Sequence, residues 1–135
     1  PNGTGTALAA GFAPPVGTNT YYVYAENNNR IACSDEDSFT VTIYQTPTVA
    51  PITPVTQCDS YILPAPPAPA TRWFTLPGGP TVTNNVERLP GFNVTTTTTL
   101  YAYAESGTAA TQICFDDEPF VITINQTPNI PAQTA

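Results

Sequence analysis

The chain repeats itself, and this self-similarity limits its fold more than any other feature. A tyrosine-rich stretch at 20–26 returns at 99–105, and a stretch beginning with cysteine at 33–43 returns at 114–124. The triplet Gln-Thr-Pro at 45–47 returns at 126–128. The first offset is 79 residues and the later two are 81 residues. A fixed period of this kind indicates one structural unit copied in tandem, here of about 80 residues.

The offsets divide the chain into one complete copy and parts of two others. Residues 1–47 match the C-terminal part of a repeat, and residues 48–128 form a complete one. Residues 129–135 resemble the proline-rich opening at 48–54, so we expect them to begin a third copy. The sequence therefore predicts a stretch cut from a longer array, with a stiff proline-rich joint near residue 47.

Composition and periodicity predict an all-β protein. Sixteen prolines and eight glycines interrupt the chain too often for long helices. Phe120, Ile122 and Ile124 alternate with polar or smaller residues, which is the period of a half-buried strand. In the complete copy we expect strands at 48–52, 57–63, 71–76, 81–86, 92–96, 98–105 and 119–125. Seven short strands in about 80 residues favour tandem antiparallel β-sandwiches of immunoglobulin-like topology over a parallel β-solenoid, whose shorter period is missing.

The tyrosine-rich strand at 98–105 has two different faces. Leu100, Ala102 and Ala104 share one face, and Tyr101 and Tyr103 share the other. We expect the tyrosine rings to cover the edge of the core, with their hydroxyls reaching solvent.

The charge balance excludes several classes of function. Three basic residues, all arginine, face ten carboxylates, and the net charge is -7. This balance is opposite to that of nucleic-acid-binding proteins.

No apolar run approaches the roughly 20 residues that a membrane-spanning helix needs. The chain contains no histidine, so a cysteine nucleophile would lack its usual base, and we expect no catalysis and no cofactor beyond the calcium considered below.

The cysteines follow the repeat. Cys58 lies early in the complete copy and Cys114 late, and we expect these two to form a disulfide, which also indicates an oxidising, extracellular compartment. Cys33 corresponds to Cys114, and its partner would lie before residue 1. The alternative is three reduced thiols in the core. Three cysteines without histidine do not match a zinc site.

Two acidic clusters recur at the same place in each copy, beside a cysteine. Calcium prefers several hard oxygen ligands, so the clusters are candidate calcium sites. The alternative is a solvated loop ahead of the last strand. The residues are Asp35, Glu36, Asp37, Asp116, Asp117 and Glu118.

Trp73 is the single tryptophan and follows Arg72. An exposed tryptophan beside an arginine could stack on a sugar ring, so both are candidate binding residues. The alternative places Trp73 in the core as the large filler that sandwiches use.

Three phrases carry a resemblance to a known group of proteins. They begin at Leu100 (Leu-Tyr-Ala-Tyr-Ala-Glu-Ser-Gly-Thr), Cys33 (Cys-Ser-Asp-Glu-Asp-Ser-Phe-Thr-Val-Thr-Ile) and Cys58 (Cys-Asp-Ser-Tyr-Ile-Leu-Pro). They resemble tandem repeats of very large secreted surface proteins, among them adhesins, of Flavobacteria and other Bacteroidota that use type IX secretion. The resemblance implies export to the cell surface and a role in a fibre or stalk. It also implies O-glycosylation candidates at Ser38 and Ser60, because each follows an aspartate.

Together these features predict a structural or adhesive segment of a long extracellular surface protein. Its expected partners are adjacent copies of the same repeat and like chains in a fibre. One alternative is a module that binds a glycan or another protein. Another is a fibre subunit whose incomplete copy is completed by a strand from a neighbouring chain.

Overall fold

The computed structural model describes residues 5–27, 30–107 and 113–131. The chain forms two compact units, Pro1–Gln45 (unit 1) and Thr46–Ala135 (unit 2), each of which is described by itself. Their boundary lies two residues before the predicted one at residue 47. Residues 1–4 of the predicted partial copy and 132–135 of the predicted third copy lie outside the described residues.

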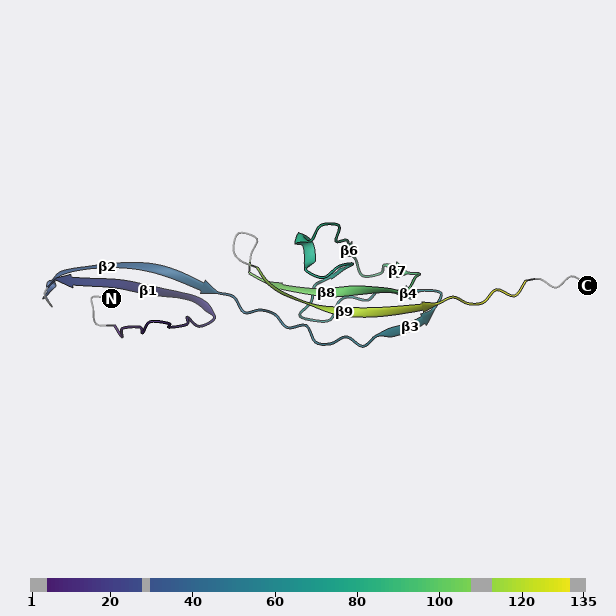
Figure 1. Ribbon diagram of the computed structural model, residues 1–135, viewed down its shortest axis with the longest axis horizontal. Coiled ribbons are helices and arrows are strands. Elements are labelled where there is room, and N and C mark those ends of the chain that lie inside the picture. Colours follow the sequence, from purple (N-terminus) through teal and green to yellow (C-terminus); the bar gives the residue numbers. More distant parts are fainter. Residues whose placement is uncertain (1–4, 28–29, 108–112, 132–135) are drawn as a thin grey trace, which may run out of the picture. The chain divides into compact units, whose positions relative to one another are not determined.

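The described residues contain nine strands, one short 3-10 helix and no α-helix. Figure 1 shows their order along the chain. The elements are β1 (Gly17–Asn27), β2 (Arg30–Ile43), β3 (Val55–Cys58), β4 (Tyr61–Ile62), β5 (Arg72–Phe74), η1 (Gly79–Thr81), β6 (Glu87–Arg88), β7 (Asn93–Val94), β8 (Thr98–Ser106) and β9 (Cys114–Asn125).

Unit 1 consists mainly of one antiparallel strand pair, β1 with β2. Tyr21 lies opposite Phe39, and the aromatic rings of Phe12, Tyr21 and Phe39 contact in series. None of residues 5–27 and 33–45 is buried. The two faces of this pair therefore remain open within the described part of the chain.

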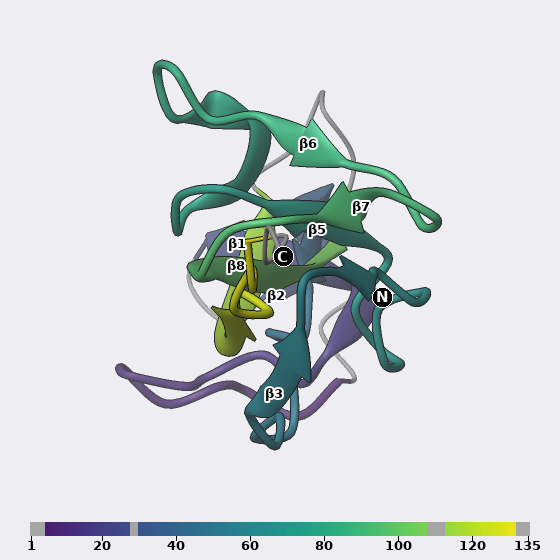
Figure 2. The same ribbon diagram turned by 90° about the vertical axis from the view of Figure 1, so that its right-hand side faces the viewer.

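The described part of unit 2 contains two sheets. The larger has the strand order β3-β9-β8-β5-β6, and the smaller pairs β4 with β7. Figure 2 shows β3 and β6 at opposite sides of unit 2, as this order requires. All pairings are antiparallel except that of β3 with β9, which is parallel. This arrangement is all-β and consistent with a β-sandwich, and its antiparallel hairpins exclude a parallel solenoid.

The core of unit 2 lies on one face of the large sheet. Leu100 on β8 lies opposite Phe120 on β9, and both are buried. Trp73 of β5 packs against Phe120 with ring centroids 5.4 Å apart. The smaller sheet contributes Val94, and Tyr61 packs against the edge of the cluster. The buried cluster consists of Val49, Leu63, Ala70, Trp73, Val94, Leu100, Ala102, Ala104, Phe120, Ile122 and Ile124.

The two long strand pairs use the same register. Tyr21 lies opposite Phe39 in unit 1, and Leu100 lies opposite Phe120 in unit 2. These residues are related by the offsets of 79 and 81 that the sequence shows. The repeated sequence therefore forms the same local structure twice.

Several strand boundaries differ from those predicted. The strand expected at 98–105 is observed at Thr98–Ser106, whereas the one expected at 119–125 begins at Cys114. The acidic residues 116–118 are thus part of a strand and not of a preceding loop, because β8 supplies hydrogen-bonding partners along this whole stretch. The prediction of strands at 48–52 and 81–86 was wrong: the first has no strand assignment, and turns replace the second.

The tyrosine-rich strand buries its smaller residues, as the alternation predicts. Leu100, Ala102 and Ala104 face the core. Tyr103, on the opposite face, is buried as well, so the expectation that its hydroxyl reaches solvent was wrong. A second, smaller aromatic cluster covers it on the outer face of the sheet, where Phe74 and Phe115 pack on its ring at 5.5 and 5.6 Å.

Candidate functional site

The chain enters unit 2 beside the first residues of β9. The backbone N–H of Val49 donates to Oδ2 of Asp116 at 2.7 Å, although the two residues are 67 positions apart. The side chain of Val49 is buried in the core cluster. Asp116 therefore anchors the opening segment, because a charge-assisted bond to a partly buried N–H is among the stronger hydrogen bonds in proteins. We call this region the N-terminal end of unit 2.

The chain leaves unit 2 at the other extremity of β9. Both carboxylate oxygens of Asp59 accept from Thr127: Oδ1 from the backbone N–H at 2.7 Å and Oδ2 from the hydroxyl at 2.6 Å. The backbone N–H of Asp59 donates to the carbonyl of Asn125 at 2.8 Å. These bonds fix the last residues of the copy to the turn after β3. We call this region the C-terminal end of unit 2.

The conformation and charge of Asp59 fit this role. Its φ of 65° is in the left-handed region, which aspartate tolerates better than most residues with a side chain. The hydrogen bonds from the hydroxyl and the backbone of Thr127 hold the pKa of the Asp59 carboxyl below its usual range, because they favour the charged form.

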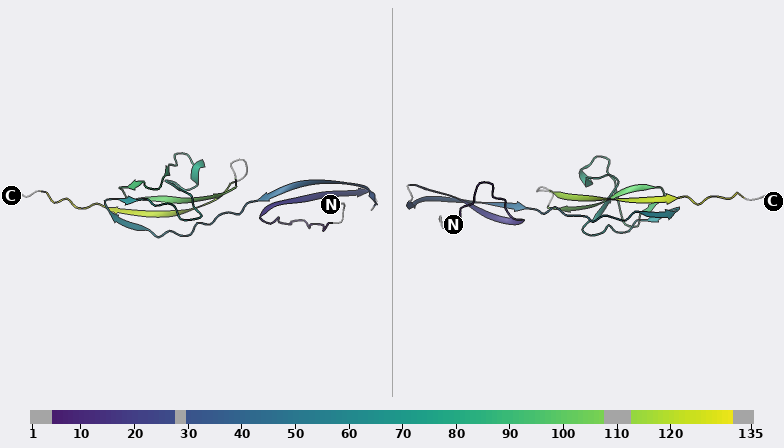
Figure 3. Two further views of the ribbon diagram at one scale, coloured as in Figure 1. Left: turned by 180° about the vertical axis from the view of Figure 1, so that it is seen from behind. Right: turned by 60° about the horizontal axis from the view of Figure 1, so that its bottom comes forward.

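The two ends are separated by the length of β9. The opening segment and β3 run parallel to β9, with Val55 opposite Ile122 and Cys58 opposite Asn125. Figures 1 and 3 show β3 and β9 finishing together where the chain leaves unit 2. Eleven residues separate Asp116 from Thr127, which at about 3.3 Å per residue corresponds to about 36 Å. The chain therefore enters unit 2 at one end of β9 and leaves it at the other.

The disulfide predicted between Cys58 and Cys114 is not formed. Cys58 pairs with Asn125 and Cys114 with Ser106, at opposite extremities of β9. Eleven residues of extended strand place their Cα atoms about 36 Å apart, whereas a disulfide requires less than about 7 Å. The prediction failed because it used only the order of the cysteines along the chain. The alternative of thiols buried in the core is also wrong, since Cys33 and Cys58 are exposed and Cys114 is half-buried.

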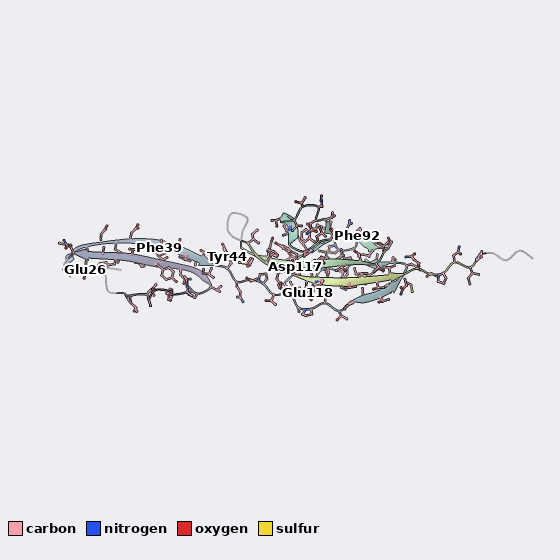
Figure 4. The ribbon with its side chains drawn as sticks, viewed as in Figure 1. Glu26, Phe39, Tyr44, Phe92, Asp117 and Glu118 are labelled. Carbon is pink, nitrogen blue, oxygen red and sulfur yellow. The ribbon has the colours of Figure 1, made fainter. Side chains whose placement is uncertain are left out.

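The acidic clusters do not converge on a common point. Asp117 accepts from the backbone N–H of Gly78 at 2.8 Å, while Asp116 accepts from Val49. Adjacent residues of a strand point to opposite faces, and Figure 4 labels Asp117 and Glu118 on β9. Within the described residues, no three Cys, Asp or Glu side chains gather as a metal site would need. Calcium binding remains a hypothesis, and these carboxylates already have structural partners.

The corresponding cluster in unit 1 lies within β2. Asp35 and Asp37 each accept, through Oδ1, from the backbone N–H of the next residue, at 3.0 and 2.8 Å. Such local bonds satisfy the carboxylates without bringing them together. The candidate glycosylation sites Ser38 and Ser60 are both exposed, which leaves them accessible to modification.

Trp73 is part of the core and does not form a sugar-stacking surface. Only 1 % of its surface is exposed, and its Nε1 donates to the carbonyl of Pro64 at 2.9 Å. Arg72 pairs with Glu105 at 2.7 Å and lies over the rings of Phe74 and Tyr103. The candidate binding role of the two residues is therefore not supported, because one is buried and the other is engaged within the sheet.

Glu105 connects this outer cluster. One of its oxygens pairs with Arg72, and the other accepts from the hydroxyl of Tyr103 at 3.0 Å. Burial, and then the neighbouring Glu105, raise the pKa of Tyr103 to about 12. The backbone at Gly79 lies so close to this cluster that a Cβ there would be 2.2 Å from the Tyr103 ring, so the position requires glycine.

The sequence analysis did not single out Asp59, Thr127 or Glu105. The turn at Asp59 could have been predicted, because Cys-Asp-Ser between two strands is a turn sequence in which aspartate readily adopts positive φ. The pairing with Thr127 could not be found this way, because it depends on a parallel contact between residues 68 positions apart.

The fold and these ends define an all-β, sandwich-like unit that is anchored where the chain enters and where it leaves. Comparison with known protein families, curated proteins and solved structures finds no match. No helix in the described part of the chain is long and apolar enough to cross a membrane.

Proposed function

We propose that this chain is a non-catalytic structural segment of a long extracellular surface protein built from tandem repeats. The observation that carries the proposal is the separation of the two ends of unit 2. The chain is fixed beside Asp116 where it enters and beside Asp59 where it leaves, about 36 Å apart along β9. A repeat with this geometry adds length to an array, whereas adjacent termini would add bulk.

We further propose that each repeat has an immunoglobulin-like topology. The order β9-β8-β5-β6 corresponds to a sheet of strands G, F, C and C′, and the pair β4–β7 corresponds to B and E in the second sheet. The first strand, β3, joins the edge beside the last one. Tandem domains of this topology are common in cell-surface proteins, which agrees with the surface location that the sequence resemblance implies.

The side chains that could perform chemistry have structural roles instead. Asp59, Asp116 and Asp117 each accept hydrogen bonds from backbone N–H groups that fix loops or chain ends. A chain without histidine then has few groups that could act as an acid or a base near neutral pH. These features support a non-catalytic role.

A second candidate is supported by the open face of unit 1. Phe39 is 51 % exposed, whereas its counterpart Phe120 is 4 % exposed. Figure 4 labels Phe39 on the β1–β2 pair. In unit 2 this face is covered by the strands that precede β8. In unit 1 the equivalent cover would come from upstream residues of the same chain, or from a neighbouring chain if the protein is a fibre subunit.

A binding module is the third candidate. Ile52, Val55, Tyr61 and Pro64 border an open apolar hollow beside the core of unit 2. The buried rings of Trp73 and Phe120 also line it. A glycan array with the native protein tests this candidate; no retained glycan would remove it.

The array proposal is tested on the native parent polypeptide by intact mass and by small-angle scattering. We expect a mass far above 14.3 kDa and an elongated particle whose length grows with the number of repeats. A native species near 14.3 kDa would instead support the fibre subunit completed by a neighbour. A compact particle of large mass would overturn the linear arrangement.

A further inference from the structure

A hollow lies along β1 in unit 1. It has a volume of about 570 Å³, and the segment ahead of β1 forms its other wall. Figure 1 shows that segment running back along the β1–β2 pair. We call this space the β1 hollow. It is lined by Gly5, Thr6, Ala7, Leu8, Thr20, Tyr21, Tyr22, Tyr24 and Glu36.

The wall formed by the segment ahead of β1 has a counterpart in unit 2. The backbone N–H of Phe12 donates to the carbonyl of Ala9, and that of Phe92 donates to Leu89, both at 3.1 Å. The two turns are related by an offset of 80 residues. At this offset, residues 7 and 8 are the counterparts of the two residues of β6. The β1 hollow therefore lies between the counterpart of β8 and the counterpart of β6.

In unit 2 a strand fills the place between these two walls. β5 lies between β6 and β8, where Trp73 has Arg88 on one side and Ala102 on the other. The counterpart of β5 in the copy that contains unit 1 falls before residue 1. The β1 hollow therefore marks the place of one strand of the repeat.

The outer face of the sheet agrees with this assignment. In unit 2, Tyr103 lies against Gly79 in the loop that follows β5, and Asp117 accepts a backbone N–H of the same loop at 2.8 Å. Their counterparts, Tyr24 and Glu36, both line the β1 hollow. The hollow thus includes the path of this loop as well as that of the strand.

The backbone of β1 presents an unpaired edge to the hollow. Tyr22 and Tyr24 lie opposite Ser38 and Glu36. The N–H groups of Ser38 and Glu36 donate to the aspartate side chains beside them on β2, at 2.8 and 3.0 Å. This marks the two pairs as the non-hydrogen-bonded ones, whose backbone groups point away from the partner strand. The N–H groups of Tyr22 and Tyr24 therefore face the hollow, and no strand of the described residues pairs with that edge.

A carboxylate lies where the strand would bring a cation. In both units a tyrosine hydroxyl donates to the glutamate two residues later at 3.0 Å, Tyr24 to Glu26 and Tyr103 to Glu105. The second oxygen of Glu105 pairs with Arg72, the first residue of β5, whose guanidinium lies 5.3 Å from the centre of the Tyr103 ring. No basic side chain among those that the structure describes pairs with Glu26. Unit 1 is thus complementary to a strand that begins with a cation.

The same strand would cover the open apolar face of unit 1. Val23 and Phe39 are 60 % and 51 % exposed, whereas their counterparts Ala102 and Phe120 are 0 % and 4 % exposed. In unit 2 the covering residue is Trp73, the middle residue of β5, which pairs with Ala102 and packs on Phe120. The middle residue of the missing strand is therefore expected to be large and apolar.

We propose that the β1 hollow binds one strand of the β5 type, antiparallel to β1, with a basic residue that pairs with Glu26 followed by a large apolar residue over Val23. The strand is a segment of the parent polypeptide that precedes residue 1, so the inference rests on the proposed array. The connection in unit 2 favours this source over a neighbouring chain. Only residues 75–86 separate β5 from β6, and such a short tether gives a strand a high effective concentration at its site.

A grafted strand tests the site in the chain itself. A copy of Ala70–Thr83 replaces Pro1–Gly3, which match positions 81–83 at the offset of 80. Hydrogen exchange followed by NMR measures the amides of Tyr22 and Tyr24. Their exchange should slow by more than about tenfold, because the strand would accept these N–H groups. Unchanged exchange would overturn the proposed site.

A matched graft separates strand binding from added length. It carries Arg72→Gly, Trp73→Ser and Phe74→Gly within the copied segment. The exchange of Tyr22 and Tyr24 should then equal that of the original chain. Slowing as large as in the first graft would show that any extension protects these amides, and would overturn the preference for a strand of the β5 type.

Glu26→Gln tests the ion pair. In the grafted chain it should speed the exchange of the Tyr24 amide by about two- to fivefold, the range for a partly exposed ion pair. In the chain without the graft it should have no such effect, because the basic partner is absent. Equal effects in both chains would show that Glu26 acts only within β1, and would overturn the pairing.

The native parent polypeptide tests the source of the strand by hydrogen exchange and mass spectrometry. Tyr22 and Tyr24 should be protected there at every protein concentration, and deletion of the counterpart of Ala70–Pro80 should remove the protection. Protection that falls on dilution would show a strand from a neighbouring chain and overturn the source. Exchange as fast as in the ungrafted chain would overturn the proposal and leave the array intact. A native mass near 14.3 kDa would overturn the array and the source, whereas the graft tests the hollow independently.

Discussion

Asp59 holds Thr127 by both of its carboxylate oxygens, at 2.7 Å to the backbone nitrogen and 2.6 Å to the hydroxyl. The contact joins the turn after the first strand of unit 2 to the residue at which the copy ends. It is the counterpart, at the C-terminal end, of the bond between Val49 and Asp116 at the N-terminal end. Unit 2 is thus fixed by an aspartate carboxylate both where the chain enters it and where the chain leaves it.

Asp59→Asn should lower the melting temperature by several degrees. The amide retains one acceptor but presents N–H groups to a donor, and it removes the charge that strengthens both bonds. Circular dichroism melts at neutral pH measure the effect. Asp37→Asn is the control, since among the described residues that carboxylate accepts from the backbone N–H of its neighbour Ser38. Equal melting temperatures for Asp59→Asn and the wild type would contradict the role.

The same pair has a signature at acid pH. The pKa of Asp59 is lower in the folded chain than in the unfolded one, so its stabilisation is present above the unfolded pKa near 4. It is lost as pH falls through the lower folded pKa. The wild type should therefore lose more stability between pH 4 and pH 2 than Asp59→Asn does.

Trp73→Ala should lower the free energy of unfolding of unit 2 by about 3–5 kcal/mol, because it removes a fully buried ring and leaves a cavity. Trp73→Phe should cost less, since it keeps most of the packing and loses the bond from Nε1 to Pro64. Leu89→Ala, at an exposed position, is the control and should change the free energy by less than about 0.5 kcal/mol. Urea unfolding followed by circular dichroism compares the three. A cost under about 1 kcal/mol for Trp73→Ala would place this ring outside the core.

Alternation predicted the strands best where one face is apolar throughout. The strand at 98–105 was placed within one residue because Leu100, Ala102 and Ala104 form an uninterrupted buried face. The strand at 119–125 was predicted too short. Its acidic residues 116–118 resemble a loop in sequence, but pairing with β8 keeps the backbone extended.

The disulfide prediction failed for a different physical reason. Local sequence does not reveal that β3 pairs in parallel with β9, a contact between residues 67 positions apart. That single pairing decides that Cys58 and Cys114 are at opposite extremities and that Asp59 reaches Thr127. The burial of Trp73, by contrast, was among the alternatives that the sequence allowed, because β-sandwich cores commonly contain one large tryptophan.

Gly79→Ala should be more destabilising than Gly91→Ala. Both glycines have positive φ, 65° and 89°, so alanine strains the backbone at each by roughly 1–2 kcal/mol. Only at Gly79 would the new Cβ also meet a ring, that of Tyr103 at 2.2 Å, whereas Gly91 has open space. Chemical unfolding of the two variants isolates the clash from the strain. Equal costs would show that the loop over Tyr103 moves freely.

Tyr103 should make unit 2 sensitive to alkali. Its folded pKa of about 12 exceeds the ordinary value near 10, because burial and Glu105 disfavour the phenolate. The stabilisation is therefore complete below pH 10 and is lost as pH rises from 10 to 12. Tyr103→Phe should flatten the fall in stability over this range. Tyr22→Phe, at an exposed position, should leave it unchanged.

Phe39→Asp and Phe120→Asp together test what covers unit 1. Phe120 is buried, so aspartate there should unfold unit 2 in any context. Phe39 is half-exposed in this stretch of chain, so aspartate should change its stability little while reducing self-association measured by sedimentation velocity. In the parent polypeptide, upstream residues would cover Phe39 in the way that the strands before β8 cover Phe120. The two substitutions should then destabilise their repeats by similar amounts, which calorimetry measures. A parent that tolerates Phe39→Asp would instead have an open face there, which would contradict cover by upstream residues.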